Sequence, residues 1–383
     1  MRICGHDYLT GDMCDIDITD GVITAISPAS KQTAGSGDLW LAPGLIDIQI
    51  NGYRGDNFCV ADVTPDQVTA AVAKMADAGV SALCATVTTQ SPASMIASVR
   101  AIARACEASV ATRDRILGIH LEGPYISPND GPRGAHPCDY VRNPDWDEMA
   151  RLQQAAGGRV RIVTLAPELP GALEFISKAS KAGMIVAIGH HAASREQINA
   201  AANAGAVLST HLGNGAHAEL PRHNNYIWEQ LAHDGLWASI IVDGHHLPPA
   251  VVKSFYRAKG QSRLILVSDA VFAAGMPVGA YEFMGLAVEV KDDGSVRLRG
   301  TPYLAGSTLK LSDGVANVMA FAGASFADAV TMATTNPARL LGVDKERGAL
   351  RVGMRGDLAV FRVVGGRYTL AQTIVGGEAV FEA

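Results

Sequence analysis

Eight apolar segments of strand length recur along the middle of the chain, and they constrain the fold more than any other feature. Most of them alternate with stretches of helical character. Such alternation is typical of a parallel (β/α)8 barrel. We therefore predict an α/β fold built on a TIM-type barrel. The eight segments are residues 45–51, 80–88, 116–122, 161–168, 185–191, 206–212, 239–246 and 264–270.

The predicted helices between these segments have recognisable ends. Thr64 begins one helix, and Gly79 ends it. Ser194 begins another, and Gly205 ends it. Serine and threonine are favoured N-caps, and glycine adopts the left-handed backbone that commonly follows a helix. Further predicted elements are helices at residues 311–321 and 325–341, and an inserted hairpin within residues 277–307 with its turn at 292–294.

The two ends of the chain share a different pattern, one of short strands and turns. Residues 2–40 alternate apolar and polar positions around an Asp20-Gly21 turn, a strong hairpin signal. Residues 348–361 and 373–383 repeat this style. We expect the ends to meet as one small β-sandwich. The predicted division is residues 1–42 and 346–383 for the sandwich and 43–345 for the barrel.

Composition excludes several classes of function. The 383 residues carry a formal net charge of −6, so no basic patch predicts binding to nucleic acid or to an anionic membrane. No apolar run reaches the length of a membrane span, and the amino terminus carries charges where a signal peptide needs an apolar core. The six cysteines form no CxxC pair. We expect a cytoplasmic protein without a disulfide framework or a zinc knuckle.

Ionisable side chains gather where the predicted strands end, and in a barrel this face carries the active site. Glu122 ends the third strand, where a buried carboxylate is costly unless a cation such as a metal ion holds it. One glutamate and two histidines around an open position form an established catalytic zinc set. The other candidates at strand ends are His190, His191, His211, Asp243, His245, His246 and Asp269.

Each of these residues also has a structural interpretation. Glu122 could pair with an arginine or cap a helix, a lone histidine could simply be hydrogen-bonded, and Asp269 could cap the segment after it. Their occurrence together at successive strand ends favours a functional site. Only one of the neighbours His190 and His191 is expected to point into the barrel mouth. Asp269 could take the proton of an attacking water and return it to a leaving amine.

Two loop residues extend the candidate site. His136 lies in the GPRGAH loop after Glu122 and could reach over the site, or it could be an ordinary loop histidine. Arg222 lies in ELPRHNNYIW. A guanidinium in such a loop suits a phosphate or a carboxylate, and a solvated surface arginine is the alternative.

The motifs at the strand ends fit a known pattern over essentially the whole chain. PGLIDIQINGYRGDNF looks like a first barrel strand with its loop, HLEGPY like a third strand that bears a ligand, and TLAPE like a fourth. IGHH and STHLGN resemble the strands that bear two metal histidines. The remaining segments are matched by IVDGHHLPP, LVSDA, LAGSTL, MATTNPARLLGV and GALRVGMRGDLAVF. The chain thus resembles the N-acetylglucosamine-6-phosphate deacetylases of the amidohydrolase superfamily.

This resemblance implies roles for individual residues. Glu122, His190 and His211 are similar to the metal ligands of the family, and Asp269 to its catalytic base and acid. His136 resembles the histidine that helps to polarise the amide carbonyl, and Arg222 falls on the phosphate arginine. The resemblance also implies a homodimer in which the neighbouring subunit contributes to the phosphate pocket. The implied substrate contacts are Ala135, His136, Asn214, Gly215, Arg222, His246, Leu304, Ala305 and Gly306.

Two departures from the family pattern matter. Many amidohydrolases carry His-x-His on the first strand for a second metal ion, whereas this chain has Gln49 and Asn51. Neither is a good zinc ligand, so we expect one divalent metal ion per subunit, Zn2+. The segment HLGNGAHAELPRHNN differs from the usual sequence of the family and has the additional residues His217 and His223. These differences concern the sugar more than the reaction.

The expected activity is metal-dependent deacetylation of an N-acetyl amino sugar phosphate, N-acetylglucosamine 6-phosphate in the first place. The products would be glucosamine 6-phosphate and acetate. One alternative is an amidohydrolase of a different N-acyl or cyclic amide substrate, in which Arg222 reads a carboxylate. A second alternative is a non-catalytic barrel used for binding or assembly, against which the retained Glu122, His190, His211 and Asp269 speak.

Overall fold

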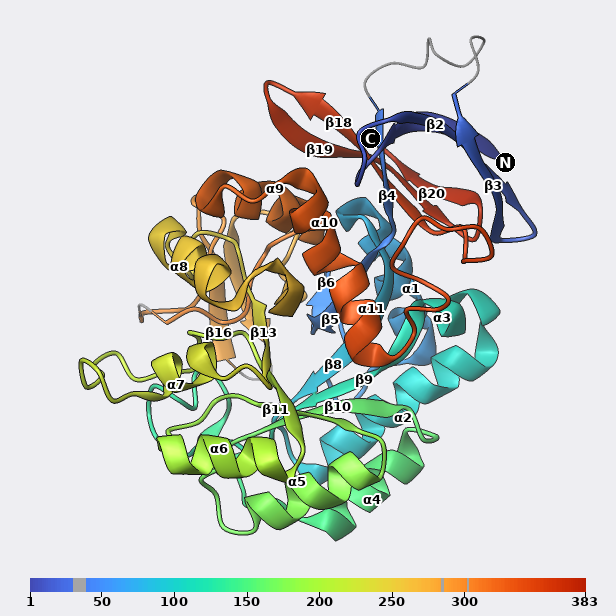
Figure 1. Ribbon diagram of the computed structural model, residues 1–383. Helices are drawn as coiled ribbons and strands as arrows, with labels where there is room; N and C mark the ends of the chain where they lie inside the picture. Colours follow the sequence, from blue (N-terminus) through green and yellow to red (C-terminus); the bar gives the residue numbers. More distant parts are fainter. Residues whose placement is uncertain (30–38, 284–285, 302) are drawn as a thin grey trace.

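A parallel barrel forms the centre of the protein, as seen in a computed structural model that describes residues 1–29, 39–283, 286–301 and 303–383. Its strands lie in the order β14-β13-β12-β11-β10-β9-β8-β5, and each neighbouring pair is parallel. Each predicted segment supplies one strand, so the predicted barrel is confirmed (Figure 1). The strands are β5 (Leu45–Ile50), β8 (Val80–Thr88), β9 (Ile116–Glu122), β10 (Val160–Leu165), β11 (Ile185–Ile188), β12 (Ala206–Ser209), β13 (Trp237–Ile240) and β14 (Leu264–Leu266).

Main-chain hydrogen bonds just beyond β14 close the barrel against its first strand. The N–H of Asp269 donates to the carbonyl oxygen of Gln49 (2.9 Å), and the N–H of Asn51 donates to that of Ala270 (2.8 Å). The seam between the first and last strands therefore runs through the residues that carry the candidate site. A small change in the closure of the barrel would move Asp269 directly.

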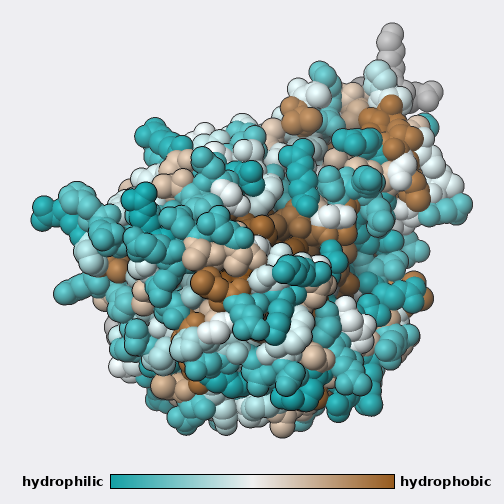
Figure 2. Space-filling view, turned by 60° about the horizontal axis from the view of Figure 1, so that its bottom comes forward, coloured by the Kyte–Doolittle hydropathy of each residue, from teal (hydrophilic) through white to brown (hydrophobic). Residues whose placement is uncertain are grey.

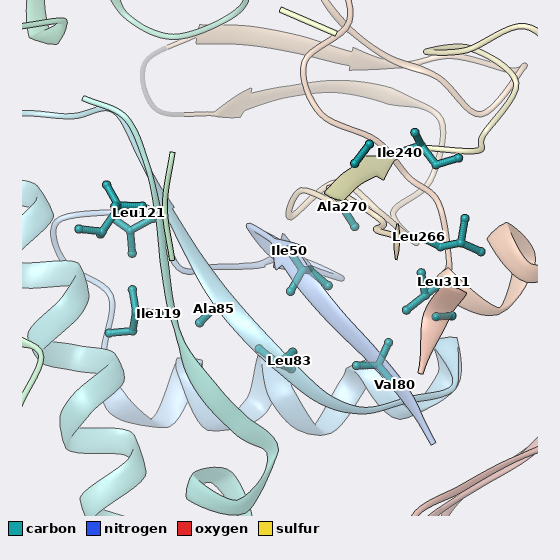
Figure 3. Packing of buried hydrophobic residues seen from close by; sticks show 14 of the residues in the cluster. Ile50, Val80, Leu83, Ala85, Ile119, Leu121, Ile240, Leu266, Ala270 and Leu311 are labelled. Atoms are coloured by element: carbon teal, nitrogen blue, oxygen red, sulfur yellow. The ribbon is translucent and has the colours of Figure 1, made fainter. Parts of the chain in front are cut away.

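The pleat of the barrel strands divides their side chains between two cores. Ile46, Ala82 and Ile162 belong to a cluster in which residues of different barrel strands meet. Their neighbours of opposite direction, such as Leu83 and Ile119, belong to the larger cluster shared with the helices (Figure 3). Alternate residues of a strand point to opposite faces, so one sequence of mostly apolar residues fills both cores.

The helices surround the barrel, and several lie on its outside in Figure 1. The predicted ends of two of them are confirmed. Thr64 and Ser194 each form a capping box with the glutamine three residues later. Gly79 has a left-handed φ of 78° and ends the turn that follows the first of these helices. The helices are α1 (Pro65–Lys74), α2 (Pro92–Ala108), α3 (Val110–Arg115), α4 (Trp146–Ala155), α5 (Ala172–Lys181), α6 (Arg195–Ala204), α7 (Tyr226–Ala232), α8 (Pro249–Lys259), α9 (Leu311–Ala322), α10 (Phe326–Ala333) and α11 (Thr335–Leu341). Short 3-10 turns are η1 (Met75–Ala78), η2 (Cys138–Tyr140) and η3 (Gln261–Arg263).

The predicted helix at residues 325–341 is wrong in one respect, because it is broken into α10 and α11. Thr334 stands between them with φ −136° and ψ −76°, outside helical geometry. Pro337 explains the break. In a continuous helix its ring would clash with the carbonyl four residues earlier, whereas near the start of a new helix it is tolerated.

The two ends of the chain meet, as predicted. Their seven strands form one sheet in the order β20-β19-β18-β4-β1-β2-β3. Although β20 and β2 stand far apart in this order, a Cβ added at Gly377 would lie 2.7 Å from Ile18 Cγ2. The sheet therefore curls so that its halves enclose a core of their own, as in a sandwich. The strands are β1 (Arg2–Asp7), β2 (Met13–Thr19), β3 (Val22–Pro28), β4 (Leu39–Pro43), β18 (Leu358–Val364), β19 (Arg367–Val375) and β20 (Glu378–Glu382).

The predicted inserted hairpin is present and has a third strand. β15 (Gly279–Phe283), β16 (Leu286–Val290) and β17 (Val296–Leu298) form an antiparallel sheet. A short pair, β6 (Gly52–Tyr53) and β7 (Asp56–Asn57), follows the first barrel strand. The predicted boundary at 42/43 falls at the end of β4, and that at 345/346 between α11 and β18. The division into these parts stays a prediction.

The face of the molecule in Figure 2 is mostly hydrophilic, with smaller hydrophobic patches between. Among the helices that the structure describes, none combines the length and the apolar character needed to cross a membrane.

Candidate active site

A cavity of about 660 Å3 opens at the carboxyl ends of the barrel strands. Most of the predicted site residues line it, although they come from distant parts of the sequence. The exception is Arg222, which is not among the described residues of the lining. The predicted residues that do line the cavity are Glu122, Ala135, His136, His190, His211, Asn214, Gly215, His246, Asp269, Leu304, Ala305 and Gly306.

Three of the lining residues bring their ligand atoms close together. Glu122 Oε1 lies 3.1 Å from His190 Nε2 and 2.7 Å from His211 Nε2, and the two nitrogens are 3.1 Å apart. Atoms that share one zinc ion at about 2.0–2.1 Å in tetrahedral geometry lie roughly 3.3 Å apart. The three predicted ligands therefore converge on one point with the spacing that a metal ion requires.

The tautomer of His190 also fits a metal ligand. Its Nδ1 lies 2.8 Å from the carbonyl oxygen of Pro132, which can only accept a hydrogen bond. Nδ1 must therefore carry the proton, and a neutral ring then turns the lone pair of Nε2 towards Glu122 and His211. A lone pair facing a carboxylate is repulsive unless a cation lies between them, and a carbonyl partner on the other nitrogen is the usual support of a metal-bound histidine.

Glu122 is buried and charged. Burial alone would raise the pKa of its carboxyl, whereas positive charge at the position of the two histidine rings holds that pKa well below its usual range. Gln49 Nε2 donates a further hydrogen bond to Oε1 (2.9 Å). A buried carboxylate with neutral donors on one side and histidine nitrogens on the other offers a strong site for a divalent cation.

His136 stands beside this group. Ligand atoms of Glu122, His136 and His190 all lie within 4.8 Å of one another, so His136 lies beside the same point. Burial and the neighbouring His190 ring lower the pKa of His136 to about 3, and the ring is neutral. Its Nδ1 contacts Thr89 Oγ1 at 2.8 Å.

The backbone is unusual where the functional side chains leave the barrel. Five described residues other than glycine have a positive φ, and three of them are His190 (51°), His211 (28°) and Asp269 (48°). Left-handed backbone is costly for residues with a Cβ and persists where the surrounding structure enforces it. Each of the three follows a barrel strand by two or three residues, so this conformation turns the side chain into the cavity.

Asp269 is held by amides of the first strand. Asn51 Nδ2 donates to Asp269 Oδ1 (2.7 Å), and Gln49 Nε2 donates to the same oxygen (3.3 Å). Both bonds go to one oxygen, which leaves Oδ2 available to accept a proton. Burial raises the pKa of the Asp269 carboxyl to about 6, and the nearby Glu122 carboxylate acts in the same direction.

Gln49 and Asn51 thus have a role that the sequence interpretation missed. The interpretation considered them only as poor metal ligands, whereas they donate hydrogen bonds to the two carboxylates of the site. A signal was present, because residues 49 and 51 lie two apart on one strand and must share a face. Their carbonyl oxygens, Gln49 Oε1 and Asn51 Oδ1, have no hydrogen-bond partner among the described residues.

The remaining histidines of the strand ends divide between the cavity and the core. His246 lines the cavity, and its Nδ1 donates to Asp243 Oδ2 (2.7 Å), which fixes the ring. His245 instead contacts the carbonyl oxygen of Asp293 in the inserted sheet (3.0 Å). His191 is buried and packs its ring on Tyr226 (5.3 Å between ring centres). Only His190 of the adjacent pair reaches the cavity, as expected.

Two glycine-containing loops press on the ring of His190. A Cβ added at Gly215 would lie 2.6 Å from His190 Nδ1, and one at Gly134 would lie 3.2 Å from Cε1. Both glycines have a positive φ. The absence of a side chain at these two positions therefore lets the loops after β9 and β12 pack directly against the Nδ1 and Cε1 atoms of the ring.

Arg222 stands apart from the cavity of its own chain, which departs from the expectation that it shares the site. Its side chain is exposed, and its carbonyl oxygen accepts a hydrogen bond from Trp228 Nε1 (3.3 Å). The segment that leads into α7 projects from the edge of the molecule in Figure 1. The loop thus carries Arg222 outward, while residues 213–219 line the cavity.

Residues 40–380 match the amidohydrolase family. The N-acetylglucosamine-6-phosphate deacetylase of Bacillus subtilis is 35% identical over 90% of this chain and 88% of its own length. This chain belongs to the N-acetylglucosamine-6-phosphate deacetylase family of the amidohydrolases. The family includes a relative with another sugar in its name, the N-acetylgalactosamine-6-phosphate deacetylase of Escherichia coli O157:H7, which is 34% identical over 89% of this chain and 88% of its own.

Solved structures of the deacetylase family agree with the fold. An aspartate-to-alanine variant of the Mycobacterium smegmatis N-acetyl-D-glucosamine-6-phosphate deacetylase, in complex with N-acetyl-D-glucosamine-6-phosphate, superposes with a TM-score of 0.89. It is 31% identical and covers 99% of both chains. The Thermotoga maritima deacetylase has a TM-score of 0.85 at 28% identity and covers both chains completely.

Proposed function

We propose that the protein hydrolyses N-acetylglucosamine 6-phosphate to glucosamine 6-phosphate and acetate. The observation that carries this proposal is the meeting of Glu122, His190, His211 and Asp269 in one cavity. Relatives at about a third identity over most of the chain bear the name of this activity. The combination of a metal-ligand set and a free carboxylate suits the addition of water to an amide.

Glu122, His190 and His211 would hold one divalent metal ion, and zinc suits this set of one carboxylate and two imidazoles. When bound, such an ion lowers the pKa of water and polarises a carbonyl group. The amides of Gln49 and Asn51, which donate to carboxylates, support a single ion. The side-chain amides of both residues already donate hydrogen bonds at positions where a second ion would need histidine ligands.

Asp269 would act as the proton carrier of the reaction. Its Oδ2 accepts the proton of the water as the water oxygen attacks the acetyl carbon. The same carboxyl then returns the proton to the sugar nitrogen as the carbon–nitrogen bond breaks. Amides on Oδ1 keep Oδ2 in one orientation through both transfers. A positioned base of this kind contributes about 10^2- to 10^4-fold to a rate.

His136 would donate a hydrogen bond to the acetyl oxygen, on which negative charge develops during the attack. This role requires the proton on Nε2, and so it requires the Thr89 hydroxyl to donate to Nδ1 (2.8 Å) in preference to its longer contact with the Glu122 carbonyl oxygen (3.4 Å). A depressed pKa keeps the ring neutral, so Nε2–H is a fixed donor that does not titrate near neutral pH. Removal of one such donor costs about 3 to 4 kcal/mol in related sites.

The sugar phosphate would lie along the loops that rim the cavity. Ala135, Asn214, Gly215, His246 and the segment 304–306 line it and are the proposed contacts. We propose a homodimer in which Arg222, exposed and outside its own cavity, reaches the phosphate bound by the neighbouring subunit. An exposed Trp228 side chain (49%) beside this segment offers apolar area for such an interface.

The cytoplasm is the proposed location. All six cysteines are free, and five of them are buried, which suits a reducing compartment. Cell fractionation with antibody detection would test this location.

Acetate release from a panel of substrates tests the proposed activity. The panel comprises N-acetylglucosamine 6-phosphate, N-acetylgalactosamine 6-phosphate, N-acetylglucosamine and one cyclic amide. The expected result is the highest kcat/KM on N-acetylglucosamine 6-phosphate. The galactosamine epimer serves as the sharpest comparison, since a relative of similar identity bears its name. Turnover restricted to unphosphorylated or cyclic substrates would reject the proposal.

A further inference from the structure

His217 lies in the loop after β12, and it lines the cavity. We propose that His217 is a specificity-determining residue that donates a hydrogen bond from Nε2 to the phosphate of the substrate. The role rests on the proposed function, because it presumes a phosphorylated N-acetyl sugar in this cavity.

The hydroxyl of Tyr226 orients the ring of His217. The main-chain N–H of His217 donates to Tyr226 Oη (2.8 Å), and the ring Nδ1 lies 3.0 Å from the same oxygen. The hydroxyl keeps its own hydrogen when it accepts the main-chain bond, and it can donate that hydrogen to Nδ1. In this arrangement a neutral ring carries its proton on Nε2, which becomes a donor.

The other histidines of the cavity are committed to different partners. His190 and His211 face Glu122, His136 contacts Thr89, and His246 pairs with Asp243. No lysine or arginine is found among the cavity-lining residues within the described ranges. For a phosphate bound by one chain, His217 is therefore the cavity histidine whose Nε2 is available to donate a hydrogen bond. The exposed carboxylates at the rim, Asp130 and Glu219, cannot serve as donors.

The backbone of His217 is held close to the candidate metal ligands. Tyr226 is buried, and a Cβ added at Gly131 would lie 3.0 Å from His217 Cα, so the neighbouring loop packs directly on its backbone. Gly215, whose added Cβ would lie 2.6 Å from His190 Nδ1, precedes His217 by two residues. Two residues of chain span at most about 7 Å, so the backbone of His217 lies within about that distance of Gly215.

The test compares N-acetylglucosamine 6-phosphate with unphosphorylated N-acetylglucosamine. His217→Ala should lower kcat/KM for the phosphorylated sugar about 10- to 100-fold, the effect of losing a hydrogen bond to a charged group. The variant should leave the slow turnover of the unphosphorylated sugar and the metal content within about twofold of the parent. His217→Gln keeps a side-chain N–H and should recover part of the loss.

His223→Ala is the matched control, because His223 is an exposed histidine of the same segment and is not among the described lining residues. It should leave both substrates unaffected. Tyr226→Phe removes the hydroxyl that orients the ring and should give a smaller loss, about three- to tenfold, on the phosphorylated sugar alone.

Equal losses on both substrates for His217→Ala would overturn the assignment and give the residue a structural role. Unchanged kcat/KM values on both substrates would overturn it as well. If the parent protein released no acetate from any N-acetyl sugar phosphate, the proposed function itself would be rejected, and the role of His217 with it.

Discussion

Replacement of Asp269 by asparagine should separate catalysis from folding. Oδ1 of Asp269 accepts hydrogen bonds from Asn51 and Gln49. An asparagine can keep its carbonyl oxygen at this position, so the buried amide donors stay satisfied. Its nitrogen then takes the place of Oδ2 and cannot accept a proton. Asp269→Asn should therefore fold, bind metal and bind substrate, but it should turn the substrate over slowly.

The size of the effect follows from these contacts. Loss of a positioned base costs about 10^2- to 10^4-fold in rate, or roughly 3 to 5 kcal/mol of barrier. The cost in stability should stay below about 1 kcal/mol for asparagine. Asp269→Ala differs, because it leaves the buried Asn51 and Gln49 donors without the Oδ1 acceptor. An unsatisfied buried donor costs about 1–3 kcal/mol, so alanine should also lower the free energy of unfolding.

Single-turnover acetate release, metal content and urea unfolding of the parent and both variants measure these quantities. Asparagine should lose turnover at an unchanged unfolding free energy, and alanine should lose both. Activity of Asp269→Asn within about tenfold of the parent would remove Asp269 from the mechanism. An asparagine variant as unstable as the alanine variant would refute the hydrogen-bond argument.

Three further outcomes are expected. Purified protein should hold about one zinc-class ion per chain after loosely bound ions are removed, and two tightly held ions would show that the amides of Gln49 and Asn51 do not prevent a second site. Arg222→Ala should lower kcat/KM about 10^2- to 10^3-fold for the phosphorylated sugar and hardly at all for the unphosphorylated one; Arg222→Lys should restore part of the loss, and equal losses on both sugars would assign Arg222 to the fold. Gly215→Ala should weaken metal affinity by tenfold or more in a chelator competition, because its Cβ would lie 2.6 Å from His190 Nδ1. Gly183→Ala has the same left-handed cost (φ 82°) without a neighbour within 4 Å, so an equal loss of metal affinity there would refute the clash.

The barrel and the meeting of Glu122, His190 and His211 could be predicted from the sequence because both follow from local pattern. Each barrel strand is a short apolar segment, and the geometry of the barrel then brings the strand ends to one face. Glu122, His190 and His211 needed no further information to meet. The capping residue Thr64 likewise acts within four residues of itself.

Features that depend on the path of a loop or on packing could not be predicted in this way. Arg222 follows the cavity-lining residues in the chain but projects away from them, and no local pattern sets that direction. The orientation of His217 depends on Tyr226, nine residues later, whose hydroxyl has no sequence signature of its own. The left-handed backbone of Asp269 arises from the closure of the barrel, a contact across 220 positions.

The most direct test of the central claim is product analysis with N-acetylglucosamine 6-phosphate. The parent protein should release acetate and glucosamine 6-phosphate in equal amounts, lose this activity in a chelator and regain it when zinc is restored. His211→Ala, which removes a proposed metal ligand beside Glu122, should release neither product after the same zinc addition. Undiminished deacetylation by the chelated protein or by His211→Ala would contradict the account, because the chemistry would then proceed without the metal group.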